Sequence, residues 1–62
     1  SFGLLRFYLL ALKAAGVVLL RLGDIDNARD HLRKLAALDQ RDQLGASALL
    51  DIIDPVPDVS AA

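Results

Sequence analysis

Apolar residues cover most of the circumference of the first predicted helix, which spans residues 4–22. Sixteen of the first 22 residues of the chain are apolar. At about 100° per residue, Arg6 and Lys13 lie within about 20° of each other on a helix and Arg21 lies about 60° further round, so the three cations form one narrow polar stripe. Because the remaining apolar surface has to be covered, we expect this helix to have neighbours on two sides.

A Gly-Asp turn separates this helix from a second one, expected over about Ile25 to Leu38. Gly23 can adopt the left-handed conformation that ends a helix, and Asp24 or Asp26 can cap the next one. Apolar residues of the second helix recur three and four positions apart, and charged residues fill its other side, which is the pattern of an amphipathic helix. Since the turn is so short, the two helices must pack as an antiparallel hairpin.

A third helix and a tail follow the polar break at Asp39–Asp42. Apolar residues recur over 44–53, and Pro55 ends the helix near Ile53 because the residue before a proline is disfavoured in the helical conformation. The tail has two prolines and no usable periodicity. We therefore predict an all-α fold, an antiparallel helical hairpin plus a short third helix. Residues 1–54 form the helical module, and residues 55–62 form an extended or disordered tail.

The size and composition of the chain limit how it can be stabilised. Its 62 residues make one small domain at most, and a chain this short buries only about 60% of the surface that its unfolded form exposes. It has no cysteine and no zinc-ligand set, so packing alone must stabilise it. It is 55% hydrophobic with a mean hydropathy of +0.43, which is unusually apolar for a soluble monomer. Part of its surface is expected to face another chain or a missing remainder, and the absence of methionine favours a chain cut from something longer.

The charges are divided along the chain. The segment before Gly23 carries +3 and the segment from Asp24 onward carries −4. Three cations spread over sixteen residues are too few for the dense basic stripe of a nucleic-acid binder. Lys13 argues against a membrane span or a signal peptide, because the longest uncharged run in this segment, Ala14–Leu20, is far shorter than the about 20 residues that a span needs. We expect a cytoplasmic protein with no nucleic-acid partner.

Residues 9–42 resemble one tetratricopeptide repeat. The resemblance rests on small residues at helix contacts and turns and on apolar residues in the second helix: Gly16, Gly23, Ala28, Leu32, Leu35 and Leu38, with Asp39 closing the unit. Gly16 and Ala28 are expected where the paired helices come closest, with Leu19 and Leu32 filling the space beside them. The chain departs from the family where Leu19 replaces a frequent aromatic residue and Gln40 replaces a common proline.

The resemblance extends to residues 43–53, which are similar to the first helix of a following repeat that Asp54 and Pro55 truncate. A single repeat cannot bury its own faces, and about three are normally needed. The resemblance therefore implies either the C-terminal end of a longer repeat array or a small subunit completed by a partner.

A partner-binding face on the first helix is also implied by the resemblance. In the family, the first helices of successive repeats line a concave groove, and five residues of this chain are expected to face it: Leu10, Lys13, Val17, Leu20 and Arg21. Some family members hold a C-terminal carboxylate with a lysine at the place of Lys13 and an asparagine one turn later, where this chain has Val17. The alternative is that Lys13 and Arg21 are only the solvated stripe of an otherwise buried helix.

No residue pattern indicates catalysis, a cofactor or a metal. His31 is the single histidine, and no nucleophile or metalloprotease motif accompanies it, so we treat it as a solvated helix residue. The stretch from Asp24 to Asn27 begins like a calcium loop, but Ala28 and Arg29 occupy the next ligand position and the required glycine. Its aspartates are therefore expected to be helix caps. We predict no catalytic, cofactor-binding or metal-binding residues and no small-molecule substrate.

These observations predict a non-enzymatic protein-protein interaction module of tetratricopeptide type that acts as a scaffold, a chaperone or an assembly subunit. It is expected to bind a protein partner or to self-associate. The alternative is a small accessory or oligomerisation subunit whose apolar first helix packs on a larger enzyme or membrane complex. The context before Ser1 distinguishes the two, because further repeats there favour the array.

Overall fold

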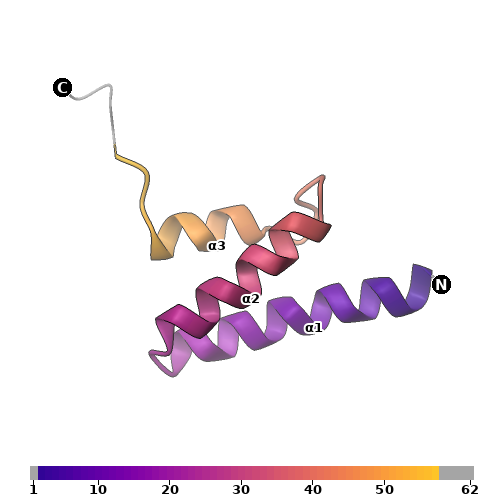
Figure 1. Cartoon of the computed structure of the whole chain (residues 1–62), viewed down its shortest axis with the longest axis horizontal. Helices are drawn as coiled ribbons and strands as arrows, with labels where there is room; N and C mark the ends of the chain where they lie inside the picture. Colours follow the sequence, from indigo (N-terminus) through magenta and orange to yellow (C-terminus); the bar gives the residue numbers. More distant parts are fainter. Residues whose placement is uncertain (1, 58–62) are drawn as a thin grey trace.

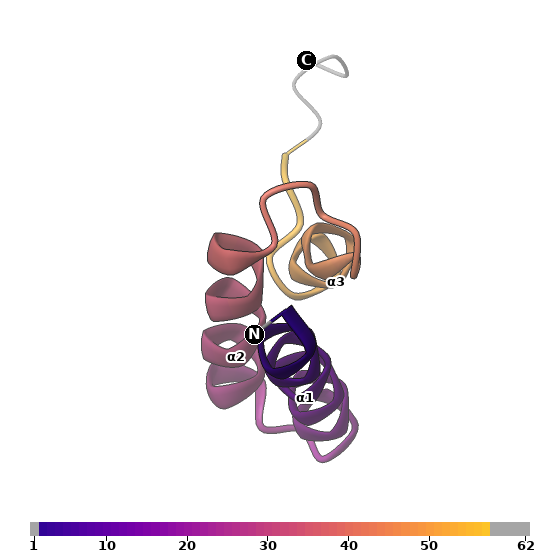
Figure 2. The ribbon, with the colours of Figure 1, turned by 90° about the vertical axis from the view of Figure 1, so that its right-hand side faces the viewer.

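Three helices make up the computed structural model of the chain, which describes residues 2–57 (Figure 1). Helix α1 spans Phe2–Arg21, α2 spans Ile25–Leu38 and α3 spans Ala46–Ile53. Helix α2 packs against both α1 and α3. Seen end-on, α1 and α3 lie on the same side of α2, so the helices form two layers (Figure 2). The predicted all-α fold, an antiparallel helical hairpin with a short third helix, is confirmed.

The turn between α1 and α2 provides hydrogen-bond partners for backbone groups at the end of α1 and at the start of α2. Gly23 has φ +80°, its N–H donates to the carbonyl of Leu20 at 3.1 Å, and the N–H of Asp24 donates to the carbonyl of Leu19 at 2.9 Å. This pair of bonds is the Schellman arrangement that requires a left-handed residue, a conformation that glycine adopts without a Cβ clash. Asp24 is also the N-cap of α2, because its carboxylate accepts from the N–H of Asn27 at 3.4 Å.

The connection from α2 to α3 is longer than the apolar pattern suggested. The expected third helix included Leu44, whereas α3 begins at Ala46. Two residues of the connection are in the left-handed conformation, Asp42 with φ 52° and Gly45 with φ 76°, and they precede the later start of the helix.

The end of α3 lies at Ile53 as predicted, and residues 55–57 have no regular secondary structure. The rest of the predicted tail, residues 58–62, lies outside the described residues.

The core is small and lies where the three helices meet. Its buried residues are Leu12 of α1, Leu32 and Leu35 of α2 and Ala46 of α3. Partly buried apolar residues pack around these four: Leu9, Leu20, Ala36, Leu44, Leu49, Leu50 and Ile53. The hydrophobic core therefore draws on all three helices, and α3 belongs to the same packing unit as the hairpin.

Helices α1 and α2 are in close contact at Gly16, one of the two small residues that the sequence placed between them. A Cβ atom at Gly16 would lie 2.8 Å from Cδ2 of Leu32. Ala28, the other small residue of this contact, is completely buried. Leu32 lies beside Gly16, and Leu19 is half-buried and lines a surface hollow, whereas Leu20 packs against the core.

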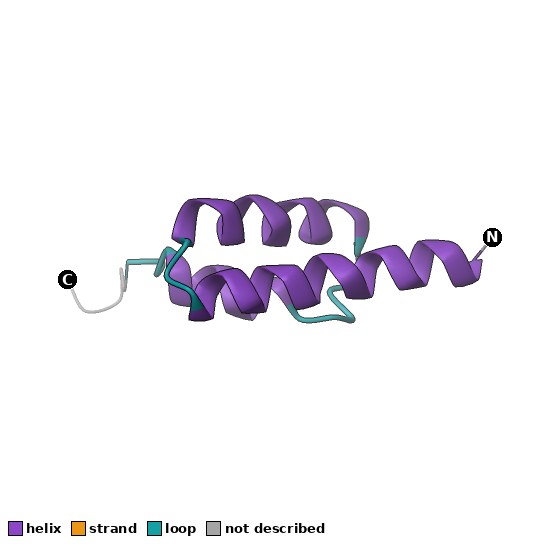
Figure 3. Cartoon of the chain, turned by 90° about the horizontal axis from the view of Figure 1, so that it is seen from below, coloured by secondary structure: helices purple, strands orange, loops and turns teal. Residues whose placement is uncertain are grey.

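Helix α1 remains largely exposed. It is buried at Leu12 and Gly16, and its first turns extend beyond the end of α2 (Figure 3). Phe2, Leu4 and Phe7 are 93%, 74% and 74% exposed. In length and composition α1 also meets the requirements of a membrane-spanning helix, a criterion that core helices of soluble proteins and signal sequences meet as well. Within the described chain α1 packs mainly on α2, so the second neighbour that its apolar surface predicts is not part of this fold.

Candidate protein-binding surface

The five residues that the sequence placed on a partner-binding face differ in their exposure, and we refer to them as the cationic strip: Leu10, Lys13, Val17, Leu20 and Arg21. Leu10 and Arg21 are exposed, and Lys13 and Val17 are half-buried. Leu20 is also partly buried, because it packs against the core. The face available to a partner is therefore formed mainly by the other four residues.

Neither cation of the cationic strip has an acidic partner within the described chain. The ion pairs of the described residues all involve two arginines of α2, Arg29 and Arg33. Lys13 and Arg21 therefore carry uncompensated positive charge beside apolar side chains. An acidic or carboxylate-bearing segment would complement this charge, and the apolar atoms beside it would supply contact area.

Sequence reasoning missed a hollow beside the start of α1. It has a volume of about 590 Å³ and lies between α1 and the α2–α3 connection. Its lining residues are Phe2, Leu5, Arg6, Leu9, Asp39, Gln43 and Leu44. Arg6 belongs to the polar stripe of α1, so the stripe continues into this hollow. The spacing of Leu5 and Leu9 shows in the sequence that these two residues share one side of α1. The opposite wall of the hollow is formed by the α2–α3 connection, so it could not be predicted before the fold was known.

Asp39 shapes that wall from within. It is 9% exposed, and its carboxylate accepts hydrogen bonds from the backbone N–H groups of Gln43 at 3.1 Å and Leu44 at 2.7 Å. These bonds hold the connection against the end of α2. Asp39 therefore positions Gln43 and Leu44, which line the hollow. The sequence analysis had assigned Asp39 only to the end of the repeat.

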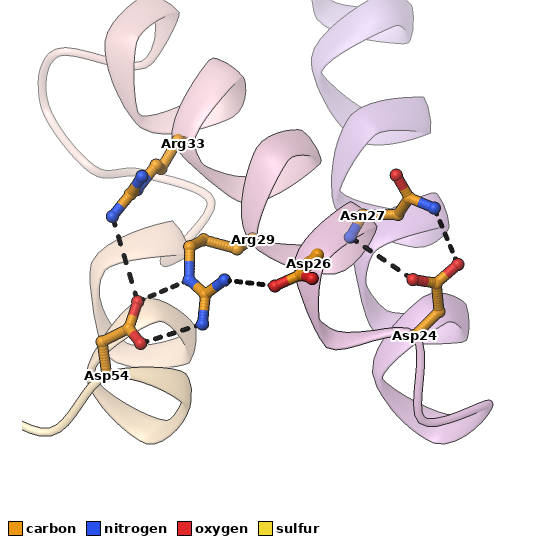
Figure 4. Close-up of polar contacts among 6 residues, drawn as sticks. All are labelled: Asp24, Asp26, Asn27, Arg29, Arg33 and Asp54. Carbon is orange, nitrogen blue, oxygen red and sulfur yellow. Dashed lines mark hydrogen bonds and ion pairs between the residues drawn. The ribbon is translucent and has the colours of Figure 1, made fainter.

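An arginine clamp joins α2 to the end of α3 (Figure 4). Arg29 donates from Nε to one carboxylate oxygen of Asp54 at 2.7 Å and from Nη2 to the other at 3.0 Å. Its remaining Nη1 donates to Asp26 at 2.8 Å, and Arg33 lies 4.0 Å from Asp54. Asp26 is thus an ion-pair partner, whereas Asp24 caps α2. The bidentate pair fixes geometry as well as charge, so it sets where α3 ends relative to α2.

The clamp is expected to make the stability of the fold sensitive to acid. The hydrogen bonds from Arg29 hold the pKa of Asp54 below its usual range, and the two carboxylates raise the pKa of Arg29. A carboxyl group whose pKa is lower in the folded than in the unfolded state stabilises the fold above the unfolded pKa of about 4, and this contribution is lost as the pH falls through the folded pKa.

Asp54→Asn should therefore lower the thermal transition temperature near neutral pH, and the difference from the parent should shrink below about pH 4. Circular dichroism melts over a pH series measure this. Asp51→Asn, at an exposed position of α3 outside the clamp, is the matched control and should melt close to the parent. A difference for Asp54→Asn that is the same at all pH values would show that the ion pair does not stabilise the fold.

The start of α3 is held by Asp42. Its carboxylate accepts from the backbone N–H of Ser47 at 3.2 Å and from the hydroxyl of the same residue. These bonds lower the pKa of Asp42. Although Gly45 is the N-cap residue and has no side chain for capping, Asp42 supplies the acceptor from three residues earlier. This cap could not be predicted from the sequence, because Asp42 reaches the start of α3 only through the fold of the connection.

A second hollow, of about 650 Å³, lies between α1 and the start of α2. Its lining is predominantly apolar: Ala14, Ala15, Val18, Leu19, Asn27 and His31. Nδ1 of His31 lies 2.8 Å from the carbonyl oxygen of Asn27, so the histidine is engaged with its own helix. Within residues 2–57 no cluster of three or more His, Cys, Asp or Glu side chains could hold a metal ion.

The chain is similar in sequence to an uncharacterized bacterial protein. The chain is 51% identical over 51 residues to a protein of Azotobacter chroococcum mcd 1 described as an uncharacterized 19.8 kDa protein in the nifW 5'region. The matched residues are 82% of this chain and 28% of that protein, so the chain spans little more than a quarter of its relative's length. No protein-family model matches the chain. No solved structure matches it either.

Proposed function

We propose that this chain is a non-enzymatic protein-protein interaction module of tetratricopeptide type, and that the cationic strip of α1 binds an acidic or C-terminal segment of a protein partner. The observation that carries the proposal is the pairing of two uncompensated cations, Lys13 and Arg21, with the accessible apolar side chains of Leu10 and Val17. Such a surface is suited to an extended segment that carries negative charge and apolar side chains in alternation.

The arrangement of the helices supports the repeat-type interpretation. Helices α1 and α3 share one layer and α2 forms the other, as expected when a hairpin is followed by the first helix of another unit (Figure 2). The close contact at Gly16 and the complete burial of Ala28 support this interpretation as well. The chain covers 28% of its relative, which leaves room for further helices in that protein.

A second candidate function is an accessory subunit that packs α1 on a larger protein or membrane complex. It is favoured by the exposure of large apolar side chains along α1, among them Phe2, Leu4 and Phe7. The two candidates differ in what they require of the cations. Binding through the cationic strip depends on salt, whereas apolar packing of α1 does not.

Reversal of both charges, Lys13→Asp with Arg21→Asp, tests the first candidate. The probes are fluorescent acidic peptides that end in a free carboxylate and matched peptides that end in an amide. We expect the parent to bind the free-carboxylate peptide more rapidly at low salt. The double variant should associate about tenfold more slowly and lose most of the salt dependence, because opposite charges steer encounter. Stopped-flow anisotropy over a salt series measures both quantities.

The matched control reverses two exposed cations away from the cationic strip, Lys34→Asp with Arg41→Asp, which changes the net charge equally. This control should retain preferential binding of the carboxylate peptide, and all variants should keep the parent's circular dichroism spectrum. If the association rate constant falls by the same factor in both double variants, only the net charge matters and the cationic strip is not a binding site. Absence of peptide binding by the parent would also count against the proposal.

A further inference from the structure

One face of α1 carries an uncharged row of exposed residues, which we call the outer seam: Leu4, Phe7, Ala11, Ala14, Val18 and Leu22. Their spacing of three or four residues places them on one side of the helix. At about 100° per residue this side lies roughly opposite the buried Leu12 and Gly16. No helix of the described chain covers the near side of α1 in Figure 3. Phe7, Val18 and Leu22 are 74%, 54% and 75% exposed.

The outer seam holds both a protruding aromatic side chain and a hollow that could receive one. Phe7 is the protruding residue. The apolar hollow of about 650 Å³ lies further along the same helix and is lined by Ala14, Ala15 and Val18 from α1. In an antiparallel pair of α1 helices centred between Ala11 and Ala14, Phe7 of one copy is level with Val18 of the other. The protruding ring and the hollow therefore meet twice, once at each end of the pair.

We propose that a second copy of this chain covers the outer seam, with the two α1 helices antiparallel and Phe7 of each copy seated in the hollow of the other. Ala11 and Ala14 form the centre of the seam, where small side chains let two helices approach closely, and the larger residues lie toward its ends. This order of sizes is self-complementary under a two-fold axis, as an isologous interface requires. An aromatic residue that fills a pocket is a frequent anchor of protein interfaces.

The size of this interface sets the expected strength of the dimer. Helix α1 has 20 residues and is about 30 Å long. Because the helix is only about 10 Å wide, pairing along one of its sides is expected to bury less than the about 800 Å² per partner of a standard interface. We therefore expect a dimer that dissociates in the micromolar range.

The electrostatic arrangement permits this pairing. The outer seam contains no charged residue, and Arg21, the nearest cation, lies about 60° round the helix from its centre. Lys13 lies further away, so the dimer does not cover Lys13 or Arg21 of either copy. The inference goes beyond the proposed function and does not depend on it, because peptide binding and self-association use neighbouring faces of α1.

Sedimentation equilibrium of the 62-residue chain over a concentration series tests the proposal. The parent should change from monomer to dimer in the micromolar range, and Phe7→Lys should raise the dissociation constant at least tenfold. Ile52→Lys is the matched control, because Ile52 is 72% exposed on α3 and lies off the seam. It should dimerise like the parent. Helix content by circular dichroism should be the same for all three, since both replaced side chains are exposed.

Disulfide formation tests the antiparallel geometry, because the chain has no cysteine of its own. An equal mixture of Phe7→Cys and Val18→Cys chains should give disulfides that join the two different variants. Phe7→Cys alone should give few, since antiparallel pairing separates the two introduced thiols by about 16 Å along the axis. If the Phe7→Cys chains instead cross-link predominantly with one another, the pairing is parallel and the proposal is overturned. A parent that stays monomeric at 100-fold higher concentration than expected, or binds phosphatidylcholine vesicles as a monomer instead, would overturn it as well.

Discussion

Gly16→Leu is expected to destabilise the chain by about 1–3 kcal/mol, although leucine is a better helix former than glycine. A Cβ atom at this position would lie 2.8 Å from Cδ2 and 2.9 Å from Cγ of Leu32. Leu32 is completely buried and belongs to the core, so any shift of its side chain has to disturb the packing around it. The gain in helix propensity is less than about 1 kcal/mol, so the cost of overpacking prevails. Urea unfolding followed by circular dichroism measures the difference.

Two further variants separate the close contact from other effects of the substitution. Ala37→Leu adds a leucine at an exposed position of α2 and should leave the stability nearly unchanged. In the background of Leu32→Ala, introduction of alanine at Gly16 should cost less than it does in the parent, because the opposing side chain has become smaller. If Gly16→Leu unfolds at a higher urea concentration than the parent, the pairing of α1 with α2 is wrong.

The hairpin could be predicted from the sequence because its signals are local. The bounds of α2 agree with the amphipathic pattern, and Gly23 and Asp24 perform the roles that their residue types favour. The contact at Gly16 followed from the family resemblance and is physical in origin, since only glycine admits Leu32 at this distance. Both kinds of signal can be recognised in a sequence, because caps and turns favour particular residue types and a glycine has no side chain.

The remaining features depend on contacts that the sequence does not display. The clamp joins Arg29 to Asp54, 25 positions apart, and nothing in the local pattern indicates that these two side chains meet. The start of α3 depends on the left-handed conformation of Asp42, which is uncommon for a residue other than glycine. Helical periodicity alone therefore placed this helix too early.

The candidate surface was predictable only in part. The stripe of cations followed from the helical repeat, and their lack of acidic partners within residues 2–57 is visible once the fold is known. The repeat resemblance did not show that Leu20 packs against the core, which is formed by residues of all three helices. The hollow beside Arg6 likewise requires the folded connection.

Asp39→Ala is expected to cost about 2 kcal/mol, because it removes a buried acceptor from two backbone N–H groups. The carboxylate lies 3.1 Å from the N of Gln43 and 2.7 Å from the N of Leu44. Without it these donors lose their partner while Leu44 stays partly buried against the core, and the connection no longer holds α3 in place. Both the unfolding free energy and the protection of the Leu44 amide against hydrogen exchange should fall.

Two comparisons isolate the role of the carboxylate in this prediction. Asp30→Ala removes an aspartate from an exposed position of α2 and should change the stability by less than about 0.5 kcal/mol. Asp39→Asn keeps one oxygen acceptor and should lie between the parent and Asp39→Ala, because a neutral acceptor forms weaker hydrogen bonds than a charged one. If Asp39→Ala and Asp30→Ala prove equally stable, the α2–α3 connection is held by its own backbone turns, and the wall of the hollow beside Arg6 does not depend on Asp39.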